Sequence, residues 1–257
     1  MTSGEKAINE NFRHTESKTN EGWIDASVRN CRLNCTRMIA FNINAHGIDN
    51  GKPREFYRDY KSLHSYPGQG VWSKDSYYFK GVFLRVMRAL DYVKSLLEWD
   101  GRNLFVLGSS QGGTQSIVAA AMDKQVTFCS AAVPALCDHN ACLEGRRPGW
   151  PTLVYVPPEK LTSEKKTFLR ILQYYDIAYF AKRIDCEVCF SVGLLDFTCP
   201  PTSVFAAYNN LPGKVVKSIQ INPDEGHGGS QKELETRFNE ILEKVLTTDL
   251  SRMGNGN

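Results

Sequence analysis

No hydrophobic run in this 257-residue sequence is long enough to cross a bilayer, and the opening residues 1–6 lack the apolar region of a signal peptide. Charge of one sign is also scarce, because 31 lysines and arginines nearly balance 28 aspartates and glutamates and leave a net charge of +3. A charge this small and scattered does not indicate nucleic acid or a membrane surface as a partner. From these absences we expect a cytoplasmic protein, as the sequence stands.

Paired metal-ligand motifs are missing as well. Eight cysteines are present, but Cys31-x-x-x-Cys35 has no second ligand pair nearby, and strand geometry sends Cys186 and Cys189 to opposite faces. The sequence is 42% hydrophobic, which is enough for a sizeable single core without disulfides. We therefore expect reduced thiols and no metal site. The cysteines in or beside predicted strands are expected to pack as small hydrophobic side chains, namely Cys129, Cys186, Cys189 and Cys199.

Two regions differ in their patterning. Residues 1–35 are polar and aperiodic, and we expect a disordered or loosely attached leader without strands. Residues 36–250 alternate between strand-like and helix-like segments, which predicts an α/β domain with a mostly parallel sheet flanked by helices. The predicted strands are 38–44, 104–107, 126–133, 188–192 and 215–221. The predicted helices are 79–97, 114–122 and a last one that starts at the capping box Ser230-x-x-Glu233.

The motif Gly108-Ser-Ser110-Gln-Gly112 joins the strand at 104–107 to the helix at 114–122. Strand, G-x-S-x-G turn and helix together are typical of the nucleophile elbow of α/β-hydrolases, whereas the motif alone also fits a glycine-rich turn before a helix. In an elbow, Gly108 and Gly112 keep Cβ atoms out of a sharp turn, and Ser110 is the nucleophile. The backbone N–H of Gln111 would then face a developing oxyanion.

A serine nucleophile needs a base and an orienting acid, which follow it in this fold as Asp or Glu and then His, each after a strand. Asp196 follows the strand at 188–192, and His227 follows the strand at 215–221. We expect Asp196 and His227 to complete the triad. Asp196 could instead be an acid ahead of a helix N-terminus. Two acids close to His227 then compete with Asp196 for the role of the orienting acid, namely Asp224 and Glu225.

Residues of about 134–185 interrupt the alternation of strands and helices. They include Arg146-Arg-Pro-Gly-Trp-Pro151 and an aromatic-rich stretch, 168–182, that we predict to be one helix. An insertion at this place in an α/β-hydrolase overhangs the active site, so we interpret it as a lid that sets specificity.

Several segments resemble one family. These are the elbow Gly-Ser-Ser-Gln-Gly-Gly, the helix with Arg88-Ala-Leu-Asp-Tyr, the segment Val133-Pro-Ala-Leu-Cys-Asp-His139, and the stretch from Gly193 to Asn209. Over residues 38–246 the sequence is similar to acetyl xylan esterases, in the carbohydrate esterase family that includes cephalosporin C deacetylases. The resemblance implies a serine carboxylesterase that deacetylates xylan fragments or other small acetylated alcohols without a cofactor. It leaves open whether the protein forms a homo-oligomer and whether full-length relatives are exported.

The sequence departs from the pattern of that family at its N-terminus. Members of that family carry a further strand ahead of the one at 38–44, ending in a loop that supplies a second oxyanion N–H. Residues 1–35 contain no apolar run for it. We therefore expect an N-terminally truncated or remodelled member in which N-terminal strands are missing. One alternative is a catalytically impaired remnant that acts as a binding module or has no activity. Another is the same triad acting on other esters, lactones or peptides.

Candidate pocket residues follow from these placements. We expect His46, Gly47 and Trp150 at the pocket, and Trp150, Tyr155 and Tyr174 could stack on a sugar, although such aromatic side chains often only pack.

Overall fold

The computed structural model describes residues 15–19, 22–26, 39–48, 53, 55–56 and 65–254. The chain divides into two compact units: the first comprises residues 1–66 and 81–101, and the second comprises residues 67–80 and 102–257. Within these described ranges, no helix has the length and hydropathy of a membrane span.

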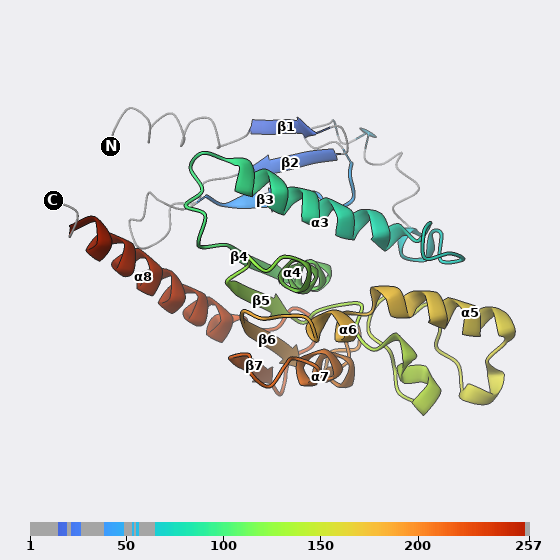
Figure 1. Cartoon of the computed structure of the whole chain (residues 1–257). Coiled ribbons are helices and arrows are strands. Elements are labelled where there is room, and N and C mark those ends of the chain that lie inside the picture. Colours follow the sequence, from blue (N-terminus) through green and yellow to red (C-terminus); the bar gives the residue numbers. More distant parts are fainter. Residues whose placement is uncertain are drawn as a thin grey trace. The chain divides into compact units, whose positions relative to one another are not determined.

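The second unit is built on a four-stranded parallel sheet in the order β4-β5-β6-β7 (Figure 1). Its strands are β4 (Phe105–Ser109), β5 (Phe128–Ala132), β6 (Glu187–Gly193) and β7 (Lys217–Asn222). Parallel neighbours need crossover connections, and these pass through α4 (Gln111–Met122), the helices between β5 and β6, and α7 (Pro201–Asn209). The predicted α/β class with a parallel sheet flanked by helices is confirmed.

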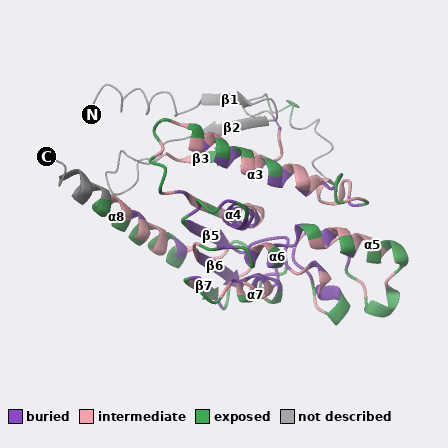
Figure 2. Cartoon of the chain, in the orientation of Figure 1, coloured by how far each residue is buried: buried purple, intermediate pink, exposed green. Residues whose placement is uncertain are grey.

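Helices cover both faces of this sheet. Figure 1 shows α8 (Lys232–Gly254) along one side and α4, α6 and α7 along the other. On the α8 side, Phe238 meets the rings of Phe105 and Phe128 at centroid distances of 6.1 and 6.4 Å. The strand β5 is buried along its whole length, and β6 is buried from its second residue, as expected for central parallel strands (Figure 2).

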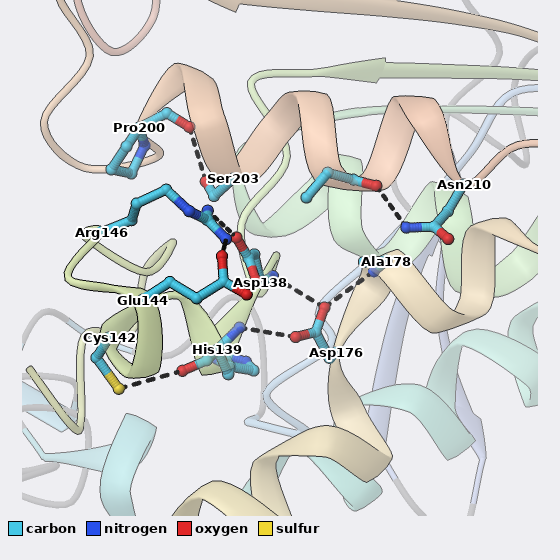
Figure 3. Close-up of polar contacts among 11 residues, drawn as sticks. Asp138, His139, Cys142, Glu144, Arg146, Asp176, Ala178, Pro200, Ser203 and Asn210 are labelled. Atoms are coloured by element: carbon cyan, nitrogen blue, oxygen red, sulfur yellow. Dashed lines mark hydrogen bonds and ion pairs between the residues drawn. The ribbon is translucent and has the colours of Figure 1, made fainter. Parts of the chain in front are cut away.

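The segment between β5 and β6 contains only short helices. They are η3 (His139–Glu144), η4 (Pro158–Lys160), α5 (Ser163–Leu172), η5 (Gln173–Tyr175) and α6 (Ile177–Ala181). The single helix predicted over 168–182 is therefore wrong. Asp176 has extended backbone angles, φ −78° and ψ 121°, and its side chain caps α6 by accepting the N–H of Ala178. The same carboxylate accepts the N–H groups of Asp138 and His139, a long-range contact that local periodicity does not reveal (Figure 3).

The first unit contains an antiparallel sheet in the order β1-β2-β3, made of β1 (Thr15–Thr19), β2 (Gly22–Ala26) and β3 (Phe41–Ile43). Our expectation of no strand within residues 1–35 is thus corrected. β1 pairs with β2 and β2 pairs with β3, and this backbone pairing can form strands without an apolar run. The other residues of the predicted leader, and Met38, lie outside the described residues.

The short η2 (Tyr66–Gly68) and the long α3 (Tyr78–Ser95) both cross the boundary between the two units. Within the first unit, Tyr92 of α3 meets Phe41 of β3 at 5.2 Å between ring centroids.

The described cysteines are all free thiols. Cys129, Cys189 and Cys199 are buried and Cys186 is partly buried, as expected for core side chains. The pair Cys31 and Cys35 lies outside the described residues.

Candidate active site

Ser110 is the single residue between β4, which ends at Ser109, and α4, which begins at Gln111. Its backbone angles, φ 54° and ψ −117°, lie in a sparsely populated region that costs about 1–3 kcal/mol. Three backbone hydrogen bonds hold it there. Its N–H donates to Ala132 O at 2.9 Å, and its carbonyl accepts from Thr114 N and Ala135 N, each at 3.1 Å. The strand, sharp turn and helix expected around the motif are thus observed, and the role of Ser110 as nucleophile stays a prediction.

The two motif glycines have different roles in this turn. A Cβ at Gly108 would lie 2.3 Å from the backbone carbonyl atoms of Gly112, so only glycine fits there. A Cβ at Gly112 would meet no atom within 4 Å, so the expectation that both positions require glycine is wrong for Gly112. The next residue does require it, because a Cβ at Gly113 would lie 2.9 Å from Ala132 O.

Ser110, His227 and Asp196 form one hydrogen-bonded series in the second unit. His227 Nε2 lies 2.9 Å from Ser110 Oγ, and His227 Nδ1 lies 2.8 Å from Asp196 Oδ2. The three side chains come from the loops that follow β4, β7 and β6, where parallel strands end at one edge of the sheet. A neutral imidazole satisfies both contacts in one tautomer only, with Nδ1–H donating to Asp196 and Nε2 accepting the Ser110 hydroxyl.

Asp196 has no exposed side-chain surface, whereas His227 exposes 30% of its side chain. The second carboxylate oxygen of Asp196 accepts the backbone N–H groups of Thr198 at 2.7 Å and Cys199 at 2.9 Å. Both oxygens are therefore oriented by donors, and the carboxylate is aimed at His227. The competing acid Glu225 instead accepts a hydrogen bond from the backbone N–H of Ser230.

Cys199 lies beside this series, a proximity that the sequence reasoning missed. Its sulfur and one donor atom each of Asp196 and His227 all lie within 4.8 Å of one another. Burial and the charge of Asp196 raise the pKa of the thiol to about 12, although contacts with Trp150 and Ser110 oppose the rise, so it stays protonated. These three groups could share a metal ion, but the carboxylate and the imidazole are already paired with each other. The spacing of three residues between Asp196 and Cys199 is the sequence signal that could have predicted this proximity.

Trp150 borders the loop after β6 that carries Asp196, which we call the acid loop. Its backbone N–H donates to Thr198 O at 3.0 Å, and its ring meets Phe79 edge-on at 6.1 Å. The side chains of Tyr155 and Tyr174 are exposed.

His46 and Gly47 belong to the first unit, so their part in the pocket stays a prediction. The His46 ring meets Tyr66 edge-on at 4.9 Å, and burial together with the charge of Arg85 lowers its pKa. Gly47 has φ 68°, and a Cβ there would lie 2.5 Å from the Arg85 guanidinium.

The chain is similar to a known protein family. The family described as acetyl xylan esterase (AXE1) matches residues 35–244. The chain is 34% identical over 209 residues to the acetyl esterase Axe7A of Xylanibacter ruminicola, which covers 80% of this chain and 46% of that protein.

Two solved structures are similar at a TM-score of 0.60. The acetyl xylan esterase from Paenibacillus sp. R4 is 29% identical, with 78% of this chain and 61% of that chain covered. Acetyl xylan esterase 1 from Thermoanaerobacterium sp. JW/SL YS485 is 28% identical, with 70% and 58% covered. The chain thus spans about half to three-fifths of the length of these relatives. It belongs to the acetyl xylan esterase (AXE1) family of α/β-hydrolases.

Proposed function

We propose that this chain is a serine carboxylesterase that removes acetyl groups from xylan fragments or other small acetylated alcohols. The observation that carries the proposal is the Ser110–His227–Asp196 series, with contacts of 2.9 and 2.8 Å, at a strained elbow. The printed names of the relatives, acetyl esterase and acetyl xylan esterase, support the acetyl ester as substrate.

In the proposed reaction, Ser110 Oγ attacks the acetyl carbonyl carbon while His227 Nε2 takes the hydroxyl proton. Asp196 holds the imidazole and stabilises the imidazolium that forms. The carbonyl oxygen becomes an oxyanion, which the Gln111 N–H at the start of α4 would stabilise as a donor. Collapse breaks the ester bond, and His227 gives its proton to the departing alcohol. Water then attacks the acetyl-enzyme with His227 as base, and acetate leaves as Ser110 regains its proton.

We also propose that the segment between β5 and β6 borders the substrate and acts as a lid. Its backbone joins the two sides of the site: Ala135 N donates to the Ser110 carbonyl at 3.1 Å, and Trp150 N donates to Thr198 O in the acid loop at 3.0 Å. Between these points, Leu136 N donates to Trp150 O at 2.6 Å. Changes in this segment are therefore expected to alter KM and substrate choice.

Labelling with a fluorophosphonate probe, followed by peptide mapping, tests the nucleophile. We expect stoichiometric adduct on Ser110 in the wild type and none in Ser110→Ala. Turnover of p-nitrophenyl acetate should fall to a small residual rate in His227→Ala, and His46→Ala should retain far more activity. A stoichiometric adduct on another serine would contradict the assignment. A folded protein that neither labels nor turns over would favour the silent binding module.

A substrate panel tests the acetyl preference. We compare kcat/KM for acetylated xylo-oligosaccharides with that for butyryl esters, lactones and peptide substrates. The acetyl esters should lead the panel, and a lead for any other class would keep the triad but replace the substrate.

A further inference from the structure

Two buried amide side chains lie next to the loop that carries His227. Gln220 and Asn222 are two residues apart on β7, so their side chains project from the same face of the strand. They are only 6% and 8% exposed. A buried amide left without hydrogen-bond partners destabilises the fold, so the partners of these two side chains indicate their role.

Both amides donate to one atom. Gln220 Nε2 and Asn222 Nδ2 each lie 2.9 Å from the carbonyl oxygen of Ser230. Gln220 Nε2 also donates to Asn222 Oδ1 at 2.8 Å, and Gln220 Oε1 accepts the N–H of Glu233, in the first turn of α8, at 3.0 Å. The capping box predicted at Ser230 and Glu233 is therefore wrong, because residues outside that motif make both of its hydrogen bonds.

His227 lies between two anchored points of this loop. Before it, Glu225 O accepts the N–H of Leu195 at 3.0 Å, which ties the loop to the acid loop. After it, Ser230 O is held by the amide pair (Gln220 and Asn222). The stretch between is Gly226-His227-Gly228-Gly229, with Gly228 at φ 87°. Glycines restrict the backbone least, so the position of His227 depends on the two anchors as well as on its ring contacts with Asp196 and Ser110.

We propose that Gln220 and Asn222 are positioning residues for His227, an inference that rests on the proposed role of His227 as base. By holding Ser230 O they fix the end of the glycine-rich stretch. His227 then meets Ser110 at 2.9 Å and Asp196 at 2.8 Å at the same time. Displacements of about 1 Å cost on the order of 100-fold in rate.

Near-isosteric variants test the amide pair. Asn222→Asp and Gln220→Glu keep the acceptor oxygen but remove the NH₂ donations to Ser230 O, and the uncharged Asn222→Leu and Gln220→Met repeat the deletion. The matched control is Asn210→Asp, which breaks an amide-to-carbonyl bond of 2.7 Å at the far end of α7 (Figure 3). We expect kcat for p-nitrophenyl acetate to fall about tenfold or more in the pair variants with KM within about twofold, and no such fall in the control.

Combining each variant with His227→Ala separates positioning from general support of the fold. If the pair acts through His227, the double variants lose no more of the residual activity than His227→Ala alone. Equal fold-losses in both backgrounds would overturn the proposal, as would wild-type kcat in all four pair variants. If His227→Ala itself retains full turnover, the proposed function fails instead.

A proton NMR readout tests the pair without turnover. The downfield signal of His227 Nδ1–H, identified by its loss in His227→Ala, should be present in the wild type and in Asn210→Asp. It should be broadened or lost in the pair variants at temperatures well below their unfolding. An unchanged signal in those variants would overturn the proposal even if no ester proves to be a substrate.

Discussion

Gly193→Ala tests how closely the acid loop must approach the loop that carries His227. Gly193 is the last residue of β6, three residues before Asp196. A Cβ there would lie 2.5 Å from the carbonyl oxygens of both Glu225 and Gly226. These are backbone atoms on the two residues that precede His227, so no side-chain rotation can relieve the contact.

The magnitude follows from the contact distances. Real Cβ atoms essentially never approach closer than 3.0 Å, so the His227 loop must move by about 0.5 Å or more. Such a shift acts directly on the 2.9 Å contact between His227 Nε2 and Ser110 Oγ. We expect kcat/KM to fall by about tenfold or more, with a loss of about 1–3 kcal/mol in the free energy of unfolding from overpacking.

The assay compares steady-state hydrolysis of p-nitrophenyl acetate with urea unfolding for the same variant. Gly213→Ala is the control, because a Cβ at Gly213 would meet no atom within 4 Å. Wild-type kcat/KM and stability in Gly193→Ala would refute the reasoning, since the two loops could then separate without consequence.

Three further predictions concern the elbow, the acid and a buried histidine. Asp196→Asn should lower kcat by about 10⁴-fold with little change in melting temperature. An NH₂ group in place of Oδ2 cannot accept the hydrogen bond from His227 Nδ1–H, so the imidazole loses the tautomer that the reaction requires. Near-normal steady-state kinetics would contradict this. Gly108→Ala should destabilise the fold by about 3 kcal/mol or more, whereas Gly112→Ala should melt close to the wild type. Thermal melts of the two variants, followed by circular dichroism, decide whether an added Cβ is crowded only at position 108. Burial lowers the pKa of His139, although the charge of nearby Asp176 opposes the shift, so the folded state keeps the neutral form. The unfolded chain gains a proton below about pH 6.5, so stability should fall as the pH drops from there, by at most about 1.4 kcal/mol per pH unit. Urea unfolding at pH 7.5 and 5.5 should show a smaller difference in His139→Met, and an equal difference would exclude His139 as a cause.

Local patterns predicted the elements whose formation depends on neighbours in the chain. The apolar run before Gly108 predicted β4, and the small-residue stretch after it predicted α4. The strand ends ahead of Asp196 and His227 placed both on loops at one edge of the sheet, where the structure brings them together. These features depend on periodicity, on turn sterics and on chain order, and all three can be recognised in one sequence.

Contacts between distant residues were not predictable in this way. The helix expected over 168–182 breaks at Asp176 because its carboxylate is occupied by the N–H groups of Asp138 and His139, more than thirty residues earlier. The capping-box motif matched Ser230 and Glu233, but buried Gln220 on the preceding strand takes the Glu233 N–H.

The sequence by itself therefore determined the α/β class, the elbow at Ser110 and the order of serine, acid and histidine along the chain. Only the tertiary structure decided which acid faces His227, that Cys199 lies beside the series, and that Ser230 is held by two buried amides. The physical reason is that a side chain's partner is set by the packing of separate strands and loops, and burial makes each unmet hydrogen bond costly enough to override local preference.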